Sequence, residues 1–257
     1  ITSVSNNRVK KVVALNQKAK ERRQEKLYVV EGVKMFLEAP PEEIVEVYIS
    51  EGFTSAACEQ KLNSLRYEVV TEEVFRKMSD TMSPQGILCV LRMKEYTVDQ
   101  MLAGKKNLML MILEDLQDPG NLGTIIRLAD WFGISDIVCS EDSADCFNPK
   151  VVQATMGAIL RVKVHYTNLS QWLANQHNTK IYGTFLEGEN IYSAELDKSG
   201  VIVMGNEGQG ISSEVATCVS HKLLIPPYPA DRCGSESLNV AIATAVTCAE
   251  FRRQAKK

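Results

Sequence analysis

The sequence predicts an α/β protein in two parts: a small α/β domain, followed by a larger domain built on a mostly parallel sheet. Apolar runs of strand length alternate with helical patterns along the 257 residues. In the second half these runs are nearly continuous in apolar character, which is typical of strands that helices cover on both faces. The chain is 45% hydrophobic and long enough to bury one large core or two smaller ones.

The first part starts with a basic helix at about 6–25. It then alternates short helical stretches with four apolar runs of strand length, LYVVEG, EVYIS, YEVVT and GILCVL. The polar segment after these runs ends in Gly-Lys-Lys and has the character of a linker. We therefore place a small α/β domain at 1–95, a linker at 96–106 and the larger domain at 107–257.

Six apolar runs define the sheet of the second part, and helical segments lie between most of them. The predicted strands are NLMLMIL (107–113), DIVCS (136–140), RVKVHY (161–166), KIYGTFL (180–186), GVIVMG (200–205) and KLLIPP (222–227). A long helix is expected from about Ser235 to Arg253. Parallel sheets bind ligands beyond the carboxyl ends of their strands, and the turns DPGNLG and GNEGQG both fall at such ends.

The charge is unevenly distributed along the chain. Residues 1–26 contain eight Lys or Arg against Glu21 and Glu25, a balance of +6, so the remainder carries −9 of the total −3. The last residues, FRRQAKK, are basic again. Basic arms on an acidic body favour a polyanionic partner, RNA or DNA. A solvated helix face explains the same charges equally well.

Several classes of protein are disfavoured by what the sequence lacks. The N-terminal ITSVSNNRVKK does not resemble a signal peptide, and no apolar run approaches the length of a membrane span. The seven cysteines occur singly, without C-x-x-C pairs or a histidine cluster, so no metal site is predicted. Scattered cysteines fit a reducing compartment. We expect a cytoplasmic protein that needs neither membrane nor metal.

The turn GNEGQG directly follows an apolar run and invites comparison with phosphate-binding loops. A Walker A loop requires lysine where Ile211 stands, and the spacing G-x-x-G-x-G differs from the dinucleotide fingerprint G-x-G-x-x-G. Glu207 at the centre of the turn would repel phosphates. The turn therefore suits a cationic or neutral, hydroxyl-bearing ligand, and the plain alternative is a glycine turn with Glu207 exposed.

Two further stretches combine polar residues with a following helix. In LEDLQDPGNLGTIIRLADWFG (113–133), we predict that Asn121 caps a helix and that Arg127 lies in its first turn. Taken singly, Arg127 is better explained as a surface pair with Asp130. In LLIPPYPADRCGSESLNVAIATAVTCAEF (223–251), Asn239 lies in the first turns of a buried helix, beside Ser235, Glu236 and Ser237. Ser235 or Ser237 is the expected N-cap, and capping alone explains these residues.

Together and in this order, the three stretches resemble the three motifs of the SpoU branch of the SPOUT RNA methyltransferases. These enzymes methylate ribose 2′-hydroxyls of tRNA or rRNA. The matching segments are NLGTIIRLA, MGNEGQGIS and IPPYPADRCGSESLNVAIA, and NPKVVQATMGA between the first two also fits. The first half resembles the ribosomal-protein-like substrate-binding domain that often precedes this catalytic domain, with the similarity carried by LYVVEGVKMFLEA and SDTMSPQGILCVL.

The resemblance implies a deep trefoil knot, a homodimer with the substrate site at the subunit interface, and S-adenosyl-L-methionine bound in the knot. By position, the catalytic residues would be Asn121, Arg127, Glu207, Ser237 and Asn239. The cofactor would contact Thr184, Leu186, Gly205, Asn206, Gly208, Gly210, Ile225, Pro226, Ser237 and Leu238. RNA would contact Arg8, Lys10, Lys11, Arg22, Arg23, Lys26 and Arg127.

The resemblance also implies a reaction in which Arg127 lies near the attacking 2′-hydroxyl. Because a guanidinium stays protonated at neutral pH, we expect Arg127 to grip a phosphate and stabilise developing negative charge, with Glu207 and Asn121 orienting it. Two departures from the family pattern bear on the cofactor pocket: the segment 227–233 is longer, and Ala241 stands where Ser is frequent.

The expected substrate is 23S rRNA, with tRNA as the alternative. A non-catalytic RNA-binding protein on the same scaffold is a second alternative, but it predicts loss of the motifs' polar residues, and these are present. A nucleotide-dependent enzyme of another α/β class predicts a phosphate loop, and neither fingerprint is satisfied.

Overall fold

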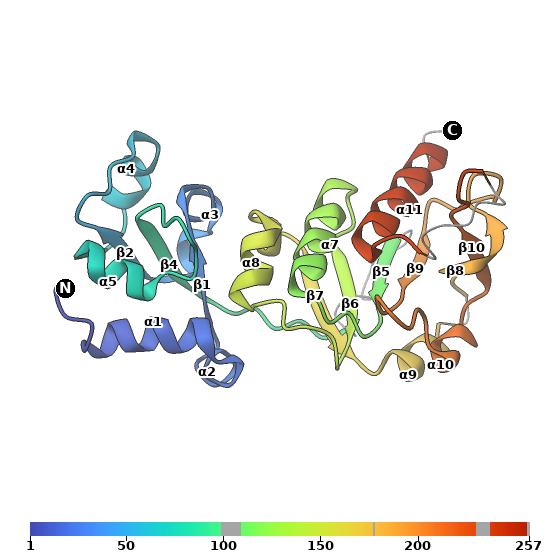
Figure 1. Cartoon of the computed structure of the whole chain (residues 1–257), viewed down its shortest axis with the longest axis horizontal. Coiled ribbons are helices and arrows are strands. Elements are labelled where there is room, and N and C mark those ends of the chain that lie inside the picture. The colour runs from blue at the N-terminus through green and yellow to red at the C-terminus, as the bar shows by residue number, and fades with distance from the viewer. Residues whose placement is uncertain (99–108, 177, 230–236, 256–257) are drawn as a thin grey trace. The chain divides into compact units, whose positions relative to one another are not determined.

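The computed structural model describes residues 1–98, 109–176, 178–229 and 237–255, which fold into two compact units (Figure 1). The first unit comprises Ile1–Glu95 together with Asp145–Leu160, and the second comprises Tyr96–Ala144 together with Arg161–Lys257. The segment 145–160, which the sequence analysis assigned to the larger domain, therefore packs with the first unit. Most of the predicted linker 96–106 lies outside the described residues.

The first unit is built on a four-stranded sheet whose strands are all among those predicted. They are β1 (Leu27–Glu31), β2 (Ile44–Ser50), β3 (Glu68–Val70) and β4 (Ile87–Arg92), in the order β1-β4-β2-β3. β4 runs antiparallel to both β1 and β2, and β3 runs parallel to β2. The helical elements are α1 (Asn7–Gln17), α2 (Ala19–Glu25), α3 (Val33–Glu38), η1 (Pro41–Glu43), α4 (Ala56–Asn63) and α5 (Glu72–Met78).

The prediction of one basic helix at 6–25 is wrong, because the helix breaks at Lys18. This residue has an extended backbone, with φ −125° and ψ 113°, and separates α1 from α2. Arg22 of α2 then donates through Nη1 to the carbonyl oxygens of Leu15 (2.7 Å) and Asn16 (3.3 Å). The break thus lets a side chain satisfy carbonyls that the end of α1 leaves open.

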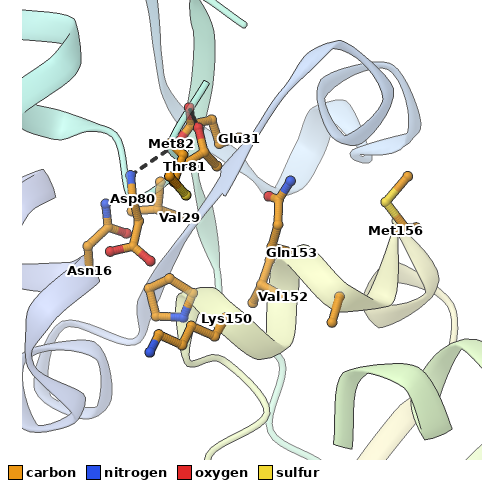
Figure 2. A pocket seen from close by; sticks show the side chains of 12 residues that line it. Asn16, Val29, Glu31, Asp80, Thr81, Met82, Lys150, Val152, Gln153 and Met156 are labelled. Atoms are coloured by element: carbon orange, nitrogen blue, oxygen red, sulfur yellow. Dashed lines mark hydrogen bonds between the residues drawn. The ribbon is translucent and has the colours of Figure 1, made fainter. Parts of the chain in front are cut away.

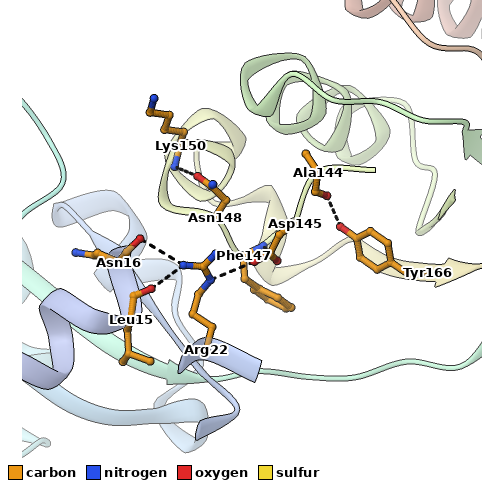
Figure 3. A network of polar contacts seen from close by, with 9 residues as sticks. All are labelled: Leu15, Asn16, Arg22, Ala144, Asp145, Phe147, Asn148, Lys150 and Tyr166. Carbon is orange, nitrogen blue, oxygen red and sulfur yellow. Dashed lines mark hydrogen bonds and ion pairs between the residues drawn. The ribbon is translucent and has the colours of Figure 1, made fainter. Parts of the chain in front are cut away.

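The segment 145–160 joins the first unit through one ion pair and one ring contact. Arg22 donates to Asp145 Oδ2 through Nη2 (2.7 Å) and Nε (3.2 Å) (Figure 3). The rings of Tyr28 and Phe147 lie 4.6 Å apart. The segment continues into α8 (Pro149–Thr155) and η2 (Ala158–Leu160), and α8 contacts β1. Both a partly buried charge pair and aromatic packing therefore hold this segment in place.

The second unit is built on a six-stranded sheet in which every pairing is parallel. Its strands are β5 (Met109–Leu113), β6 (Asp136–Ser140), β7 (Lys163–Thr167), β8 (Ile181–Asn190), β9 (Gly200–Met204) and β10 (His221–Leu224). The spatial order is β10-β8-β9-β5-β6-β7. The predicted parallel sheet is thus confirmed, with each strand overlapping its predicted apolar run.

Helices cover both faces of this sheet. The short helices α9 (Leu169–Ala174) and α10 (Ser213–Ala216) share one apolar cluster with Ile112 and Val203. On the opposite face α7 (Pro119–Trp131) packs against α11 (Val240–Ala255), and Phe251 meets the Tyr182 ring edge-on at 4.9 Å (Figure 1). Near-continuous apolar strands are therefore explained by burial on both sides.

Two expectations concern the chain as a whole, one about membrane spans and one about a trefoil knot. No helix among the described residues has both the length and the apolar character needed to cross a membrane. The predicted trefoil knot stays a prediction, because residues 230–236, through which the chain would complete it, lie outside the described ranges.

Candidate active site

The candidate site is formed where two neighbouring strands end. β5 and β9 are paired in register up to Leu113 and Met204, so the loops that follow them leave the sheet at the same edge. The backbone N–H of Glu114 donates to Met204 O at 3.0 Å and extends this pairing by one bond. Parallel topology thus brings DPGNLG and GNEGQG, which are far apart in the sequence, to one place.

The GNEGQG turn is closed by its own hydrogen bonds. Asn206 and Gly210 exchange two backbone bonds of 2.9 and 3.0 Å, and Asn206 Oδ1 accepts from the N–H groups of Gly208 (2.8 Å) and Gln209 (3.0 Å). A Cβ at Gly205 would overlap the carbonyl carbon of Gly210, and Gly210 itself has φ +71°. Gly205 and Gly210 are therefore required by the turn's own backbone.

Asn206 also ties this turn to the loop after β5. Its Nδ2 donates to the carbonyl oxygen of Asp115 at 2.7 Å and to Asp115 Oδ2 at 3.1 Å. Asp115 adopts a left-handed backbone with φ +49°, which few residues other than glycine adopt. The sequence analysis missed Asp115, because no local pattern marks an aspartate whose strained backbone is held by a turn many residues away.

Glu207 is exposed, yet its carboxylate is fully engaged with the start of α7. It accepts from the backbone N–H groups of Gln117 (3.4 Å) and Asp118 (3.2 Å) and from Asn121 Nδ2 (3.2 Å). The positive end of a helix dipole favours a carboxylate at this place. The helix cap differs from the prediction: Asp118 Oδ1 accepts from Asn121 N at 2.7 Å, and Pro119 takes the first helical position.

Asn121 and Asn239 connect the first motif to the third. Asn239 Nδ2 donates to Asn121 Oδ1 at 3.0 Å. Asn239 Oδ1 accepts from the backbone N–H groups of Ala241 (2.9 Å) and Ile242 (3.3 Å), so Asn239 caps α11. The predicted caps are wrong: Ser237 lies outside the helix, and Ser235 is not among the described residues. Glu207, Asn121 and Asn239 thus form one hydrogen-bonded chain across all three motifs.

Arg127 is exposed and lies in the third turn of α7, not in the first as predicted, because the helix begins at Pro119. Its side chain makes no hydrogen bond or ion pair with another described residue. The alternative pairing with Asp130 is not observed: Arg161 occupies Asp130 with contacts of 2.8 to 3.2 Å. Glu207 and Asn121 bond to other groups, so they position α7 and do not contact the Arg127 guanidinium.

The residues expected to bind a cofactor come from adjacent strands β10, β8 and β9. β8 pairs with β10 at Gly183 and again at Glu189, with a register shift between these positions, so 184–188 leave the ladder. A shift of this kind re-aims side chains at the end of a sheet. Thr184 Oγ1 donates to Met204 Sδ at 3.6 Å, while Leu186 is 72% exposed.

The remaining expected cofactor contacts follow β10 and precede α11. Ile225 and Pro226 are half-buried just beyond the last residue of β10, and Leu238 is 50% exposed. Ser237 is also exposed. This edge of the sheet therefore carries exposed apolar side chains, a glycine-rich turn and the half-buried residues Ile225 and Pro226. Such a set fits a ligand with a flat apolar ring and polar edges.

The basic residues expected to contact RNA fall into two groups. Arg22 is corrected: it is 3% exposed and committed to Asp145, so its guanidinium is not available to phosphate. Three others pair with acids in the same unit, in the contacts Arg8–Glu68 (2.5 Å), Lys11–Glu46 (3.5 Å) and Lys26–Glu95 (2.9 Å). The hydrogen bond that Arg8 donates to Glu68 raises the pKa of the Arg8 guanidinium.

Other cations of this region have no side-chain partner in the part of the chain that the structure describes. Lys10 and Arg23, both among the expected contacts, are exposed and make no side-chain hydrogen bond or ion pair with another described residue. The same holds for Lys18, at the break between α1 and α2, and for Lys20 in the first turn of α2. Sequence alone gave no means of separating these cations from the paired ones.

Two of the described cysteines, Cys89 and Cys248, are poor candidates for a nucleophile. Burial raises the pKa of the Cys89 and Cys248 thiols to about 12, so both are protonated at neutral pH and are weak nucleophiles. Within the described ranges, no group of three or more His, Cys, Asp or Glu side chains is placed to hold a metal ion.

Two family models match the chain. Residues 108–249 match the SpoU rRNA Methylase family, and residues 6–89 match the MRM3-like substrate binding domain. The first match covers more than half of the chain and includes the whole hydrogen-bonded chain of Asn121, Glu207 and Asn239.

Individual proteins are similar over nearly the full length. A relative from Bacillus subtilis, named 23S rRNA (guanosine(2553)-2′-O)-methyltransferase RlmP, is 28% identical over 98% of both chains. A TrmH-family structure from Porphyromonas gingivalis is 35% identical, with a TM-score of 0.80 and coverage of 98% and 99%. An AdoMet-bound rRNA methyltransferase from Sinorhizobium meliloti is 26% identical, with a TM-score of 0.85 and coverage of 98% and 97%.

Proposed function

The chain belongs to the SpoU rRNA Methylase family, and we propose from this that it transfers a methyl group from S-adenosyl-L-methionine to a ribose 2′-hydroxyl of 23S rRNA. The observation that carries the proposal is the hydrogen-bonded chain from Glu207 through Asn121 to Asn239. It joins the three motifs at the carboxyl ends of β5 and β9, where a parallel sheet binds its ligand. The name of the Bacillus subtilis relative supports rRNA over tRNA.

The residues along the β10-β8-β9 edge would hold the cofactor, which supplies a methyl group activated by a sulfonium. Leu186 and Leu238 offer exposed apolar surface for the adenine ring. The open space at Gly210, where a Cβ would meet nothing within 4 Å, leaves room for close approach to the backbone. Glu207 places negative charge at this edge, which suits a cationic sulfonium and disfavours polyphosphates.

Arg127 is the residue that we assign to the reacting ribose. A guanidinium stays protonated at neutral pH, and this one has no partner among the described residues, so its donors are free for a phosphate and for charge that develops on the 2′-oxygen. Glu207 and Asn121 act one step away: they fix the start of α7 and thereby the helix that carries Arg127. The protein's task is alignment of oxygen, carbon and sulfur.

The first unit supplies RNA affinity in this proposal. Lys10, Lys18, Lys20 and Arg23 are exposed and unpaired within the described part of the chain, so they are the cations that phosphates would meet. Phosphate contacts of this kind give affinity that falls with salt. The match to a substrate binding domain at 6–89 supports the same role.

We also propose a homodimer that uses the face formed by α7 and α11. Trp131 of α7 is 82% exposed and Ile242 of α11 is 54% exposed, although these helices pack against each other. The two side chains lie at opposite ends of the helix pair, and burying both against a second copy would favour association. The expected location is the cytoplasm, where rRNA is modified.

The proposal is tested by methyl transfer from radiolabelled S-adenosyl-L-methionine to 23S rRNA from cells that lack this protein, followed by mapping of the 2′-O-methyl position. Wild type should label one site. Arg127→Ala should reduce the rate roughly 10²- to 10³-fold, as for the loss of one donor to a developing oxyanion.

Arg127→Lys is the matched variant, because it keeps the charge but loses the planar fork. Its rate of methyl transfer should lie between those of Arg127→Ala and wild type. If both variants bind RNA and methylate at near-normal rates, the role of Arg127 is wrong. If wild type labels tRNA and leaves 23S rRNA unlabelled, the substrate is wrong while the reaction stands.

A further inference from the structure

The first unit contains a cavity whose lining shares no residue with the candidate active site. Its volume is about 430 Å³, within the ~300–1,000 Å³ typical of sites that enclose small molecules. Its walls come from the end of α1, from β1, from the loop after α5 and from α8, all of them parts of this unit (Figure 2). None of the functions discussed above uses this cavity.

One wall of the cavity is a loop that a buried carboxylate holds in place. Glu31, 8% exposed, accepts from Ser79 Oγ (2.7 Å), Thr81 Oγ1 (2.8 Å) and Asp80 N (3.3 Å). These bonds occupy the oxygens of Glu31 and fix the loop backbone. The loop in turn presents the side chains of Asp80 and Met82 at the cavity (Figure 2).

The cavity combines an apolar floor with two charged side chains that have no partner among the described residues. Val29 and Val152 are buried in its floor, and Met82 is fully exposed beside them. The side chains of Asp80 and Lys150 are exposed, and neither forms a hydrogen bond or ion pair with another described residue. A carboxylate and an ammonium thus line one cavity without neutralising each other.

We propose that this cavity binds an unstacked guanine base of the RNA, a proposal that rests on the function proposed above. A nucleobase has flat faces that suit Val29, Val152 and the flexible Met82 side chain, and polar edges that proteins read when the base is splayed out of its stack. Guanine alone among the four RNA bases presents two adjacent N–H donors on its Watson–Crick edge. The carboxylate of Asp80 has two acceptor oxygens to match them.

The surrounding charges favour RNA over a peptide as the occupant. Lys150 at the rim is free to meet the phosphate of the same nucleotide. Lys18 and Lys20 follow Asn16, another lining residue, along the chain, and both are exposed and unpaired within the described ranges. A phosphate backbone entering the cavity would therefore meet cations on two sides.

The proposal is tested with two labelled oligoribonucleotides, UUGUU and UUAUU, titrated into the full-length chain and followed by fluorescence anisotropy. Wild type should bind the guanine-containing strand roughly tenfold more tightly, the effect of one good bidentate base contact. Asp80→Asn replaces one acceptor oxygen by a donor and should abolish this preference. Glu73→Gln, which removes an exposed carboxylate of α5 outside the cavity, should keep it.

A second readout reports on the cavity itself. With carbon-13-labelled methionine methyl groups, guanosine monophosphate should shift the Met82 resonance, and adenosine monophosphate should shift it less. Equal affinities of wild type for the two strands, or an unchanged preference in Asp80→Asn, would overturn the proposal and leave the cavity to a protein partner.

Failure of this proposal can be told from failure of the proposed function. The same preparations are assayed for methyl transfer to 23S rRNA. A guanine preference without methylation refutes the enzyme assignment and keeps the cavity site. Methylation without a guanine preference refutes the cavity site and keeps the enzyme assignment.

Discussion

Glu207, in the turn after β9, accepts three hydrogen bonds from the start of α7, whereas Lys10, Lys20 and Arg23 on α1 and α2 have no side-chain partner among the described residues. All of these side chains are charged and exposed. In the turn, the charge ties one backbone segment to another and so builds the site. On the helices, the charge is left free for a ligand.

Two of the four arginines that the sequence analysis grouped as RNA contacts, Arg22 and Arg127, show the same distinction between a paired and an unpaired charge. Arg22 is buried and paired with Asp145, while Arg127 is exposed and unpaired within the described ranges. The comparison of Glu207 with the helix cations teaches that charge and exposure do not by themselves separate a structural charge from a functional one. The partners do, and the predictions below test that criterion.

The largest effect is expected at the site's backbone. Gly205→Ala would push a Cβ into the carbonyl carbon of Gly210, where no flexible side chain can yield. Overpacking of this kind costs about 3 kcal/mol or more, so cofactor affinity in calorimetry should fall roughly 100-fold. Gly208→Ala is the control, because its Cβ would meet only Asn206 Oδ1, at 3.6 Å. Since Gly208 is itself an expected cofactor contact, the two variants are compared by their free energy of unfolding. Equal effects in both variants would contradict the steric argument.

The next largest effect concerns the stability of the first unit. Asp145→Asn leaves the charge of Arg22 buried without a counter-charge, which should lower the free energy of unfolding by about 3 kcal/mol in urea titrations. The double variant Arg22→Met with Asp145→Leu removes both charges, so its free energy of unfolding should fall less than that of Asp145→Asn. If the single variant is as stable as wild type, Arg22 is not a structural charge.

A smaller effect is expected when the carboxylate of the turn is neutralised. Glu207→Gln keeps the shape of the side chain but replaces the carboxylate, which accepts from two backbone N–H groups and from Asn121, by a weaker, neutral acceptor. Hydrogen bonds to a charged group contribute about 1.5–3 kcal/mol each. Because Glu207 is exposed, the rate of methyl transfer should fall only about tenfold. RNA affinity should be unchanged, and a parallel loss of RNA binding would count against a purely positioning role.

The smallest effect should separate paired from unpaired cations. Lys20→Ala with Arg23→Ala should reduce the slope of log affinity against log salt by about 1–2, since each phosphate contact contributes about 0.7–0.9. Arg8→Ala with Lys26→Ala removes cations that acids already neutralise, and should change the slope less. The reverse order would break the comparison on which the RNA-binding set is based.

Much of the fold was predictable because its signals are local. Each predicted strand overlaps an observed one, and the parallel sheet of the second unit follows from apolar runs that alternate with helices. The exceptions are also instructive. Lys18 interrupts a helix that the charge pattern left continuous, and Asp118 and Asn239 cap helices for which Asn121, Ser235 and Ser237 were predicted.

The sequence predicted most of the residues of the candidate site, but not the contacts between them. Asn121, Glu207 and Asn239 were named from motifs, but their mutual hydrogen bonds join residues separated by 86 and 118 positions. Asp115 was missed, and Arg22 was misplaced because its partner Asp145 lies 123 positions away. No local pattern encodes such a pairing.

The sequence by itself determined where strands and helices form and which polar residues gather at the ends of β5 and β9, because periodicity and turn chemistry depend on neighbours along the chain. Only the tertiary structure decided which charged side chains pair with another protein group and which are left for a ligand. Hydrogen bonds and ion pairs depend on distances of a few ångströms between distant segments, and the packing of α8 on the first unit or of Glu207 on α7 sets those distances.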